Sequence, residues 1–108
     1  MRPLGAHLSI AGGVDKAVEL AAELDATALQ LFSRNQRQWK APPLEEAVAK
    51  SFRQQLGKGK VRFCCIHAAY LINLASPVEE TNRKSYAALV DEVWRAAKLN
   101  VNVLVLHP

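Results

Sequence analysis

The sequence predicts an α/β fold in which the strands of a parallel sheet alternate along the chain with helices. Short, nearly continuous apolar runs alternate with longer segments in which apolar residues recur at helical spacing. The order of these segments is β-α-β-α-β-α-β. Polar residues follow the apolar runs, at the strand ends where parallel sheets and barrels bind ligands and metals.

The predicted elements are separated by recognisable start and stop signals. We expect strands over residues 4–9, 28–32, 61–67 and 101–107, and helices over residues 14–24, 44–56 and 76–99. Gly57 is a natural end for the second helix. Ser76, Pro77 and Glu79 have the spacing of a capping box and predict the start of the third. Four such strands form either an open sheet or half of an eight-stranded barrel, which typically needs about 250 residues.

Composition places the chain among globular proteins. Half of its 108 residues are apolar and 22% are charged, which excludes a disordered protein and suits one small domain. The net charge of +4 is compatible with a phosphate-rich partner but supports one only weakly. The N-terminus has no hydrophobic signal run, and no segment approaches the length of a membrane span. We therefore expect a cytoplasmic protein.

The two cysteines, Cys64 and Cys65, are neighbours in the third predicted strand. Neighbouring strand residues point to opposite faces of a sheet, so a disulfide between them would be strained. We predict two free, mostly buried thiols in a reducing compartment. Metal ligation by these thiolates is disfavoured, because no further cysteine lies at ligand spacing.

Two histidines at predicted strand ends are the strongest sign of chemistry in the chain. His67 ends the third strand and His107 the fourth, so both imidazoles should lie at the same rim of a parallel sheet. Neutral imidazole suits zinc, and the matched positions favour metal ligation. Each of them, like His7 in the first strand, has a structural role as the alternative. Catalytic zinc normally takes three protein ligands, and no carboxylate here is an obvious third.

The loop over residues 34–40 is the most unusual segment. It carries three positive charges, three amides and a tryptophan within seven residues. One interpretation is nucleic-acid contact, with cations on phosphates and a long Arg or Gln side chain probing a groove. The alternative is a solvated loop with Trp39 packed under the second helix. Tyr70, after the third strand, is either a phosphate or sugar contact or a packed rim aromatic.

The chain resembles the N-terminal part of the endonuclease IV family of zinc-dependent apurinic/apyrimidinic endonucleases. The matching stretches are residues 5–13, 35–39, 67–74 and 107–108. Their order and spacing are those of the family, and the Asn-Gln-Arg-Gln-Trp and His-x-x-Tyr-Leu-Ile-Asn-Leu segments are specific to it. The resemblance implies a TIM barrel of the xylose-isomerase-like type. Residues 1–108 would form the N-terminal portion of this single domain, about the first half of the barrel.

The resemblance also implies an activity and its site. Family members hydrolyse the phosphodiester 5′ to an abasic site with zinc-activated hydroxide, leaving a 3′-hydroxyl and a 5′-deoxyribose phosphate, and they flip the abasic nucleotide out of the stack. The complete enzyme holds three zinc ions and acts on double-stranded DNA. By this resemblance His67 and His107 are the first two zinc ligands. Arg37 and Gln38 enter the minor groove, and Tyr70 contacts DNA.

The main departure from the family is that its other metal ligands, including every carboxylate, lie beyond these 108 residues. We expect no tight zinc binding and no cleavage by these residues alone. We also expect them to self-associate or aggregate through exposed sheet edges, whereas the complete enzyme is monomeric. Two alternatives stay open. One is a TIM-barrel sugar isomerase or epimerase, which should lack the basic loop, and the other is a non-catalytic truncated remnant.

Overall fold

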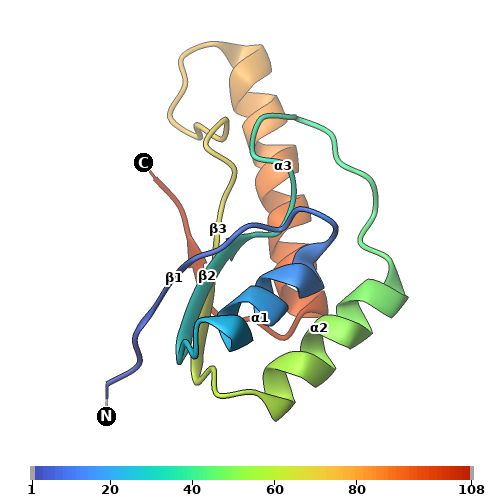
Figure 1. The fold of residues 1–108 in the computed structure, drawn as a ribbon. Helices are drawn as coiled ribbons and strands as arrows, with labels where there is room; N and C mark the ends of the chain where they lie inside the picture. Colours follow the sequence, from blue (N-terminus) through green and yellow to red (C-terminus); the bar gives the residue numbers. More distant parts are fainter. Residues whose placement is uncertain (1, 108) are drawn as a thin grey trace.

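The computed structural model describes residues 2–107. Met1 and Pro108 lie outside the described residues, and Pro108 is the last residue of the stretches that resemble endonuclease IV. It contains four strands and three helices in the predicted order (Figure 1). The strands are β1 (Gly5–His7), β2 (Ala28–Phe32), β3 (Phe63–His67) and β4 (Leu104–Val105), and the helices are α1 (Val14–Glu23), α2 (Glu46–Lys58) and α3 (Glu79–Lys98). No helix within residues 2–107 is both long and apolar enough to cross a membrane.

The four strands form one parallel sheet in the order β1-β2-β3-β4. His7 is paired with Gln30, Phe32 with His67, and His67 with Val105. The predicted parallel α/β fold is therefore confirmed. Because all strands run the same way, their carboxyl ends meet at one rim of the sheet. That rim carries the loops that follow β2 and β3 (Figure 1).

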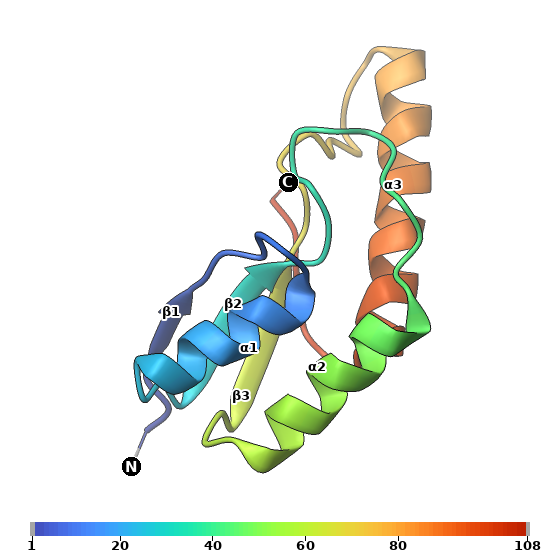
Figure 2. The same ribbon diagram turned by 45° about the vertical axis from the view of Figure 1, so that its right-hand side comes forward.

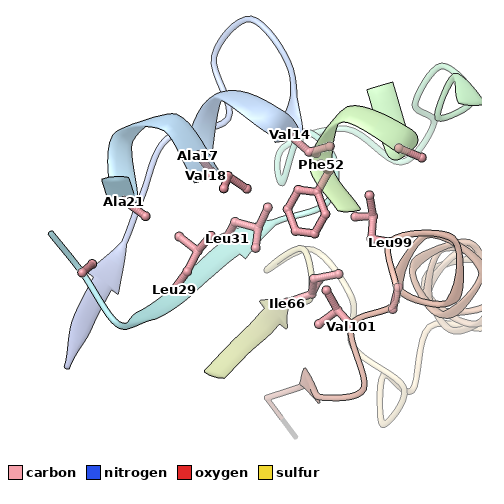
Figure 3. Close-up of a cluster of buried hydrophobic side chains, with 13 residues drawn as sticks. Val14, Ala17, Val18, Ala21, Leu29, Leu31, Phe52, Ile66, Leu99 and Val101 are labelled. Atoms are coloured by element: carbon pink, nitrogen blue, oxygen red, sulfur yellow. The ribbon is translucent and has the colours of Figure 1, made fainter. Parts of the chain in front are cut away.

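All three helices pack against the same face of the sheet (Figure 2). Figure 3 shows the core between them, with the side chains of Leu29, Leu31 and Ile66 from the strands directed toward the helices. Phe52 of α2 is fully buried in this core. The intervening strand residues face the other way, since side chains alternate across a strand. No described helix covers that second face, which we call the open face.

The cysteines lie on opposite faces of β3, as predicted, and both are free. Cys64 packs against the helix-side core, whereas the Cys65 thiol donates to Gln30 Oε1 at 3.4 Å. Burial raises the pKa of Cys64 to about 12, with a smaller contribution from Cys65. Burial raises the pKa of Cys65 as well. Both thiols are therefore protonated and unreactive near neutral pH.

One close contact explains a glycine. β1 approaches β2 so tightly that a side-chain carbon on Gly5 would lie 1.6 Å from the carbonyl oxygen of Ala28.

The edge strands are shorter than predicted. β4 pairs with β3 only at Ile66 and His67, so the predicted strand over residues 101–107 reduces to Leu104–Val105.

The predicted capping box is wrong. α3 begins at Glu79 and its N-cap is Val78, without a side-chain capping bond. The hydroxyl of Ser76 instead accepts the backbone N–H of Val78 at 3.2 Å, which forms a local turn before the helix. The side-chain amide of Asn82 holds this approach by donating to the Leu74 carbonyl at 2.6 Å.

The predicted limits of the second helix are also wrong. α2 begins at Glu46, because Glu45 is extended and acts as the N-cap. Its last residue is Lys58, so the helix continues through Gly57. A single glycine costs about 1 kcal/mol in a helix relative to alanine, which is too little to end one when the next turn still forms. Gly59 closes the helix by donating to the Gln55 carbonyl at 3.1 Å.

α1 and α3 end in the same way. The residue after each C-cap, Asp25 in one and Asn100 in the other, has a φ of 57°, in the left-handed region. The next amide donates to the carbonyl five residues earlier, at 2.9 Å in both helices: Ala26 to Ala21, and Val101 to Ala96. This is a Schellman turn, and Asp and Asn are the non-glycine residues that tolerate it best.

Candidate metal centre and nucleic-acid loop

The two strand-end histidines converge at the rim of the sheet. The Nε2 atoms of His67 and His107 are 2.9 Å apart, and the ring centroids are 4.9 Å apart at a tilt of 41°. β3 supplies one ring at its last residue, and the chain just past β4 supplies the other. His67 is half-buried and His107 is exposed. The parallel register thus brings together two residues that are forty positions apart in sequence.

A second contact orients the His67 ring. Its Nδ1 lies 2.7 Å from the Ala68 carbonyl oxygen, so Nδ1–H donates and Nε2 keeps its lone pair. Metal-binding histidines usually have this arrangement, in which the non-ligating nitrogen donates to a carbonyl or carboxylate. Two nitrogens at about 2.0–2.1 Å from one tetrahedral zinc would be about 3.3 Å apart. The pair would need to open by only a few tenths of an ångström to share one ion.

The pair is not a complete metal site. Within residues 2–107, no group of three or more His, Cys, Asp or Glu side chains is placed to hold a metal ion. His67 and His107 therefore fit as two neutral ligands of a site whose other ligands come from elsewhere. Neutral nitrogen donors of this kind suit zinc better than magnesium or calcium, which prefer oxygen.

His7 continues the row of rings on the open face. Its ring meets Phe32 edge-on at 4.5 Å, and Phe32 meets His67 at 5.6 Å. Gln30 Nε2 lies 2.8 Å from His7 Nδ1 and donates to it, because the oxygen of the same amide accepts the Cys65 thiol. Partial desolvation lowers the pKa of His7, and the neighbouring His67 lowers it further. His7 is thus a neutral, oriented ring beside the histidine pair.

The loop over residues 34–40 divides into a buried and an exposed part. Arg34 does not face solvent: its side chain is 2% exposed and pairs with Asp91 at 2.6 Å. The same guanidinium donates to the carbonyls of Gln38 at 2.9 Å and Trp39 at 2.5 Å. One of the three positive charges in the loop is therefore structural, which corrects its expected place among the phosphate contacts. Arg37 and Gln38 are exposed, as a nucleic-acid contact requires.

Trp39 joins this loop to the next one. The prediction that it packs under the second helix is wrong. It packs against a small cluster that contains Ala68, Ala69 and Ile72, and Lys84 lies 6.0 Å from its ring centroid. The loops after β2 and β3 therefore support each other at the same end of the sheet (Figure 1). Tyr70 in the second loop is 63% exposed.

Two acidic residues behind these loops were not predicted from the sequence. Glu92 of α3 is fully buried, and its carboxylate accepts the Ser33 hydroxyl at 2.5 Å and the Ala69 backbone N–H at 2.6 Å. Asp91 accepts from both Arg34 and Arg95. The available signal was helical spacing: the buried face of α3 recurs through polar as well as apolar positions, namely Ser85, Ala88, Glu92, Arg95 and Ala96.

Comparison with known proteins supports the resemblance. Residues 18–108 match a family described as xylose isomerase-like TIM barrel. The chain is 46% identical over 110 residues to the probable endonuclease 4 of Chlorobium luteolum, covering 100% of this chain and 39% of that protein. It is 49% identical over 105 residues to the probable endonuclease 4 of Oleidesulfovibrio alaskensis, covering 97% and 36%.

A solved structure matches closely as well. The crystal structure of endonuclease IV from Thermus thermophilus superposes with a TM-score of 0.93 at 40% identity, over 99% of this chain and 40% of that one. The expected fold, a partial TIM barrel of the xylose-isomerase-like type, is confirmed. The chain spans about two fifths of the length of these relatives.

Proposed function

Because this chain belongs to the xylose isomerase-like TIM-barrel family, we propose that the whole protein is a DNA-repair endonuclease of the endonuclease IV type. It hydrolyses the phosphodiester 5′ to an abasic site and leaves a 3′-hydroxyl and a 5′-deoxyribose phosphate. The observation that carries the proposal is the convergence of the His67 and His107 Nε2 atoms at 2.9 Å, beside loops that expose Arg37 and Tyr70. The similarity to proteins named endonuclease 4 supports the same substrate.

The two histidines would hold one zinc ion through their Nε2 atoms. Zinc, when bound, lowers the pKa of water and polarises the phosphate, so that hydrolysis proceeds near neutral pH. The Ala68 carbonyl fixes the His67 tautomer that such binding requires. The complete enzyme is proposed to hold three zinc ions, with the remaining ligands outside residues 1–108. Residues 1–108 would then be the N-terminal portion of a single barrel domain.

The exposed residues of the two loops would bind the DNA. The Arg37 guanidinium is long and permanently charged, so it suits the negative potential of a minor groove. Gln38 is its exposed neighbour and would fill space left in the base stack when the abasic nucleotide is flipped out. Tyr70, in the loop after β3, would present its hydroxyl and its ring to the sugar-phosphate backbone of the DNA. A reducing, cytoplasmic compartment remains our prediction from the two free thiols.

The test uses the full-length product of the gene, loaded with zinc, and a duplex with a single tetrahydrofuran abasic site. We expect incision 5′ to this site and none in the matched undamaged duplex. His67→Ala should lose zinc, measured by metal analysis, and reduce kcat by at least about a hundredfold. The matched control is His7→Ala, which removes a ring from the same face but no proposed ligand.

Three results would contradict the proposal. A protein that holds zinc but isomerises or epimerises sugars, and leaves the abasic duplex intact, would favour the sugar-enzyme alternative. A protein with neither activity would favour a non-catalytic remnant. A His67→Ala variant that keeps all its zinc and its incision rate would remove this residue from the metal site.

A further inference from the structure

A buried carboxylate lies behind the rim of the sheet. Glu92 Oε1 accepts the hydroxyl of Ser33, the first residue after β2, at 2.5 Å. Glu92 Oε2 accepts the backbone N–H of Ala69, two residues past the end of β3, at 2.6 Å. Ser33 is itself buried, at 2% exposure. One side chain of α3 therefore ties together the two loops that carry the proposed DNA contacts.

The chemistry of this contact is unusual for a purely structural one. Ser33 and Ala69 are both neutral donors to Glu92, and no ion pair to this carboxylate occurs within residues 2–107. Burying a carboxylate away from water is unfavourable, and two neutral hydrogen bonds offset only part of that cost. An apolar residue of similar volume would give comparable packing at lower cost. What an apolar residue would lack is the ability to hold two specific donors in place.

A second set of contacts clamps the far end of the first loop. Arg34 holds the carbonyls of Gln38 and Trp39 and is itself held by Asp91. Asp91 also accepts Arg95 Nε at 2.9 Å, and Arg95 donates in turn to the Pro42 carbonyl. The short segment with Arg37 is therefore fixed at both ends, and the side chains of Arg37 and Gln38 on it are exposed.

We propose that Glu92 is a positioning residue for DNA binding. Through Ser33 it sets the position of the loop that carries Arg37, and through Ala69 it sets the loop that carries Tyr70, both relative to His67 at the end of β3. Glu92 itself does not reach the DNA, because it is fully buried. This inference rests on the proposed function of the site.

The test compares three variants of the full-length, zinc-loaded protein on the abasic duplex. Glu92→Met fills the volume but leaves both donors without an acceptor. Glu92→Gln keeps the bonds, since its amide oxygen can accept from Ala69 and its amide nitrogen can donate to the Ser33 oxygen. Ser33→Ala removes only the tether to the first loop. We expect Glu92→Met and Ser33→Ala to raise the Kd about tenfold. Glu92→Gln should bind like the wild type, and kcat at saturating DNA should change less than about twofold in all three.

A double-mutant cycle separates positioning from general stability. If Ser33 acts by placing Arg37, then Ser33→Ala should cause no further loss of binding in an Arg37→Ala background. The matched control is Ser85→Ala. Ser85 is as deeply buried, and its hydroxyl accepts the backbone N–H of Asn73 at 2.8 Å, so it loses the same kind of bond without touching the first loop. Its effect should be the same with or without Arg37.

Each other outcome overturns the inference. Equal losses from Ser33→Ala in both backgrounds would mean that the tether does not act through Arg37. If Ser33→Ala binds the duplex as tightly as the wild type, the tether has no role in positioning Arg37, and this conclusion holds even if Glu92→Met fails to fold. When these results come from a wild-type protein that binds and cuts the abasic duplex, only the positioning role fails. A wild-type protein that does neither overturns the proposed function and this inference together.

Discussion

The two faces of the four-stranded sheet differ in what completes them. The helix side is finished by residues of this chain: Leu31, Phe52 and Ile66 are fully buried there. The open face carries the proposed site, with His7, Phe32 and His67 in a row of rings that no described helix covers. The difference teaches that the fold and the proposed site depend on different sets of residues. Residues of this chain complete the helix-side core, whereas the proposed metal site at the rim of the open face would need ligands from outside these residues.

The sharpest test of that difference compares two phenylalanines. Phe52→Ala removes a fully buried ring from the helix-side core and should lower the free energy of unfolding by about 3–5 kcal/mol. Phe63→Ala removes a ring that is 47% exposed on the open face and should cost about 1 kcal/mol or less. The measurement is urea unfolding of the 108-residue chain at low micromolar concentration, with light scattering to follow its mass. A large cost for Phe63→Ala would show that something already covers the open face.

A smaller change in free energy, now in DNA binding, is expected at the rim of the sheet, where Arg37 and Lys40 of one loop can be compared. Arg37→Ala should weaken binding of the full-length protein to the abasic duplex by about 1–2 kcal/mol and reduce its preference over undamaged DNA. Lys40 is also exposed. Lys40→Ala should weaken binding to both duplexes equally and should reduce the slope of log K against log salt concentration by about one. Fluorescence anisotropy at several salt concentrations measures both. Identical behaviour of the two variants would remove the special role of Arg37.

The smallest effect on stability is expected on the outer flank of α3. Tyr86, Val90, Val93 and Trp94 form an exposed apolar stripe there, although helical periodicity alone gives no sign that this side lacks a neighbour. Trp94→Ser should change stability by less than about 0.5 kcal/mol and should reduce self-association of the 108-residue chain. Sedimentation velocity measures the change. Leu24→Ser, at another exposed apolar site after α1, is the control and should leave association unaltered.

The sequence predicted the elements well where the determining pattern is local. The apolar spacing of Val14, Ala17, Val18 and Ala21 placed α1 to within one residue, and all four are buried. Strand-end positions likewise placed His67 and His107 at one rim. The capping box was wrong because Ser76 has two competing bonds within reach, and a turn to Val78 won over a helix cap.

The parts that could not be predicted depend on distant partners. Arg34 and Arg37 stand three residues apart in one loop, and nothing local distinguishes them. Arg34 is buried because Asp91 lies opposite, 57 positions later in the chain. For Glu92, helical spacing indicates a buried position, but its partners Ser33 and Ala69 follow two different strands and cannot be identified from the local pattern. Such pairings arise only when the sheet register is known.

The matching turns after α1 and α3 have a consequence for how the chain folds. Each turn closes through a bond between residues only five apart, Ala26 to Ala21 and Val101 to Ala96. Reversal of the chain after these two helices is therefore encoded within a few residues and needs no distant contact. Contacts of short sequence separation carry a small loop-closure entropy and form early. The two turns from helix to strand can therefore form during synthesis, before distant parts of the sheet have paired.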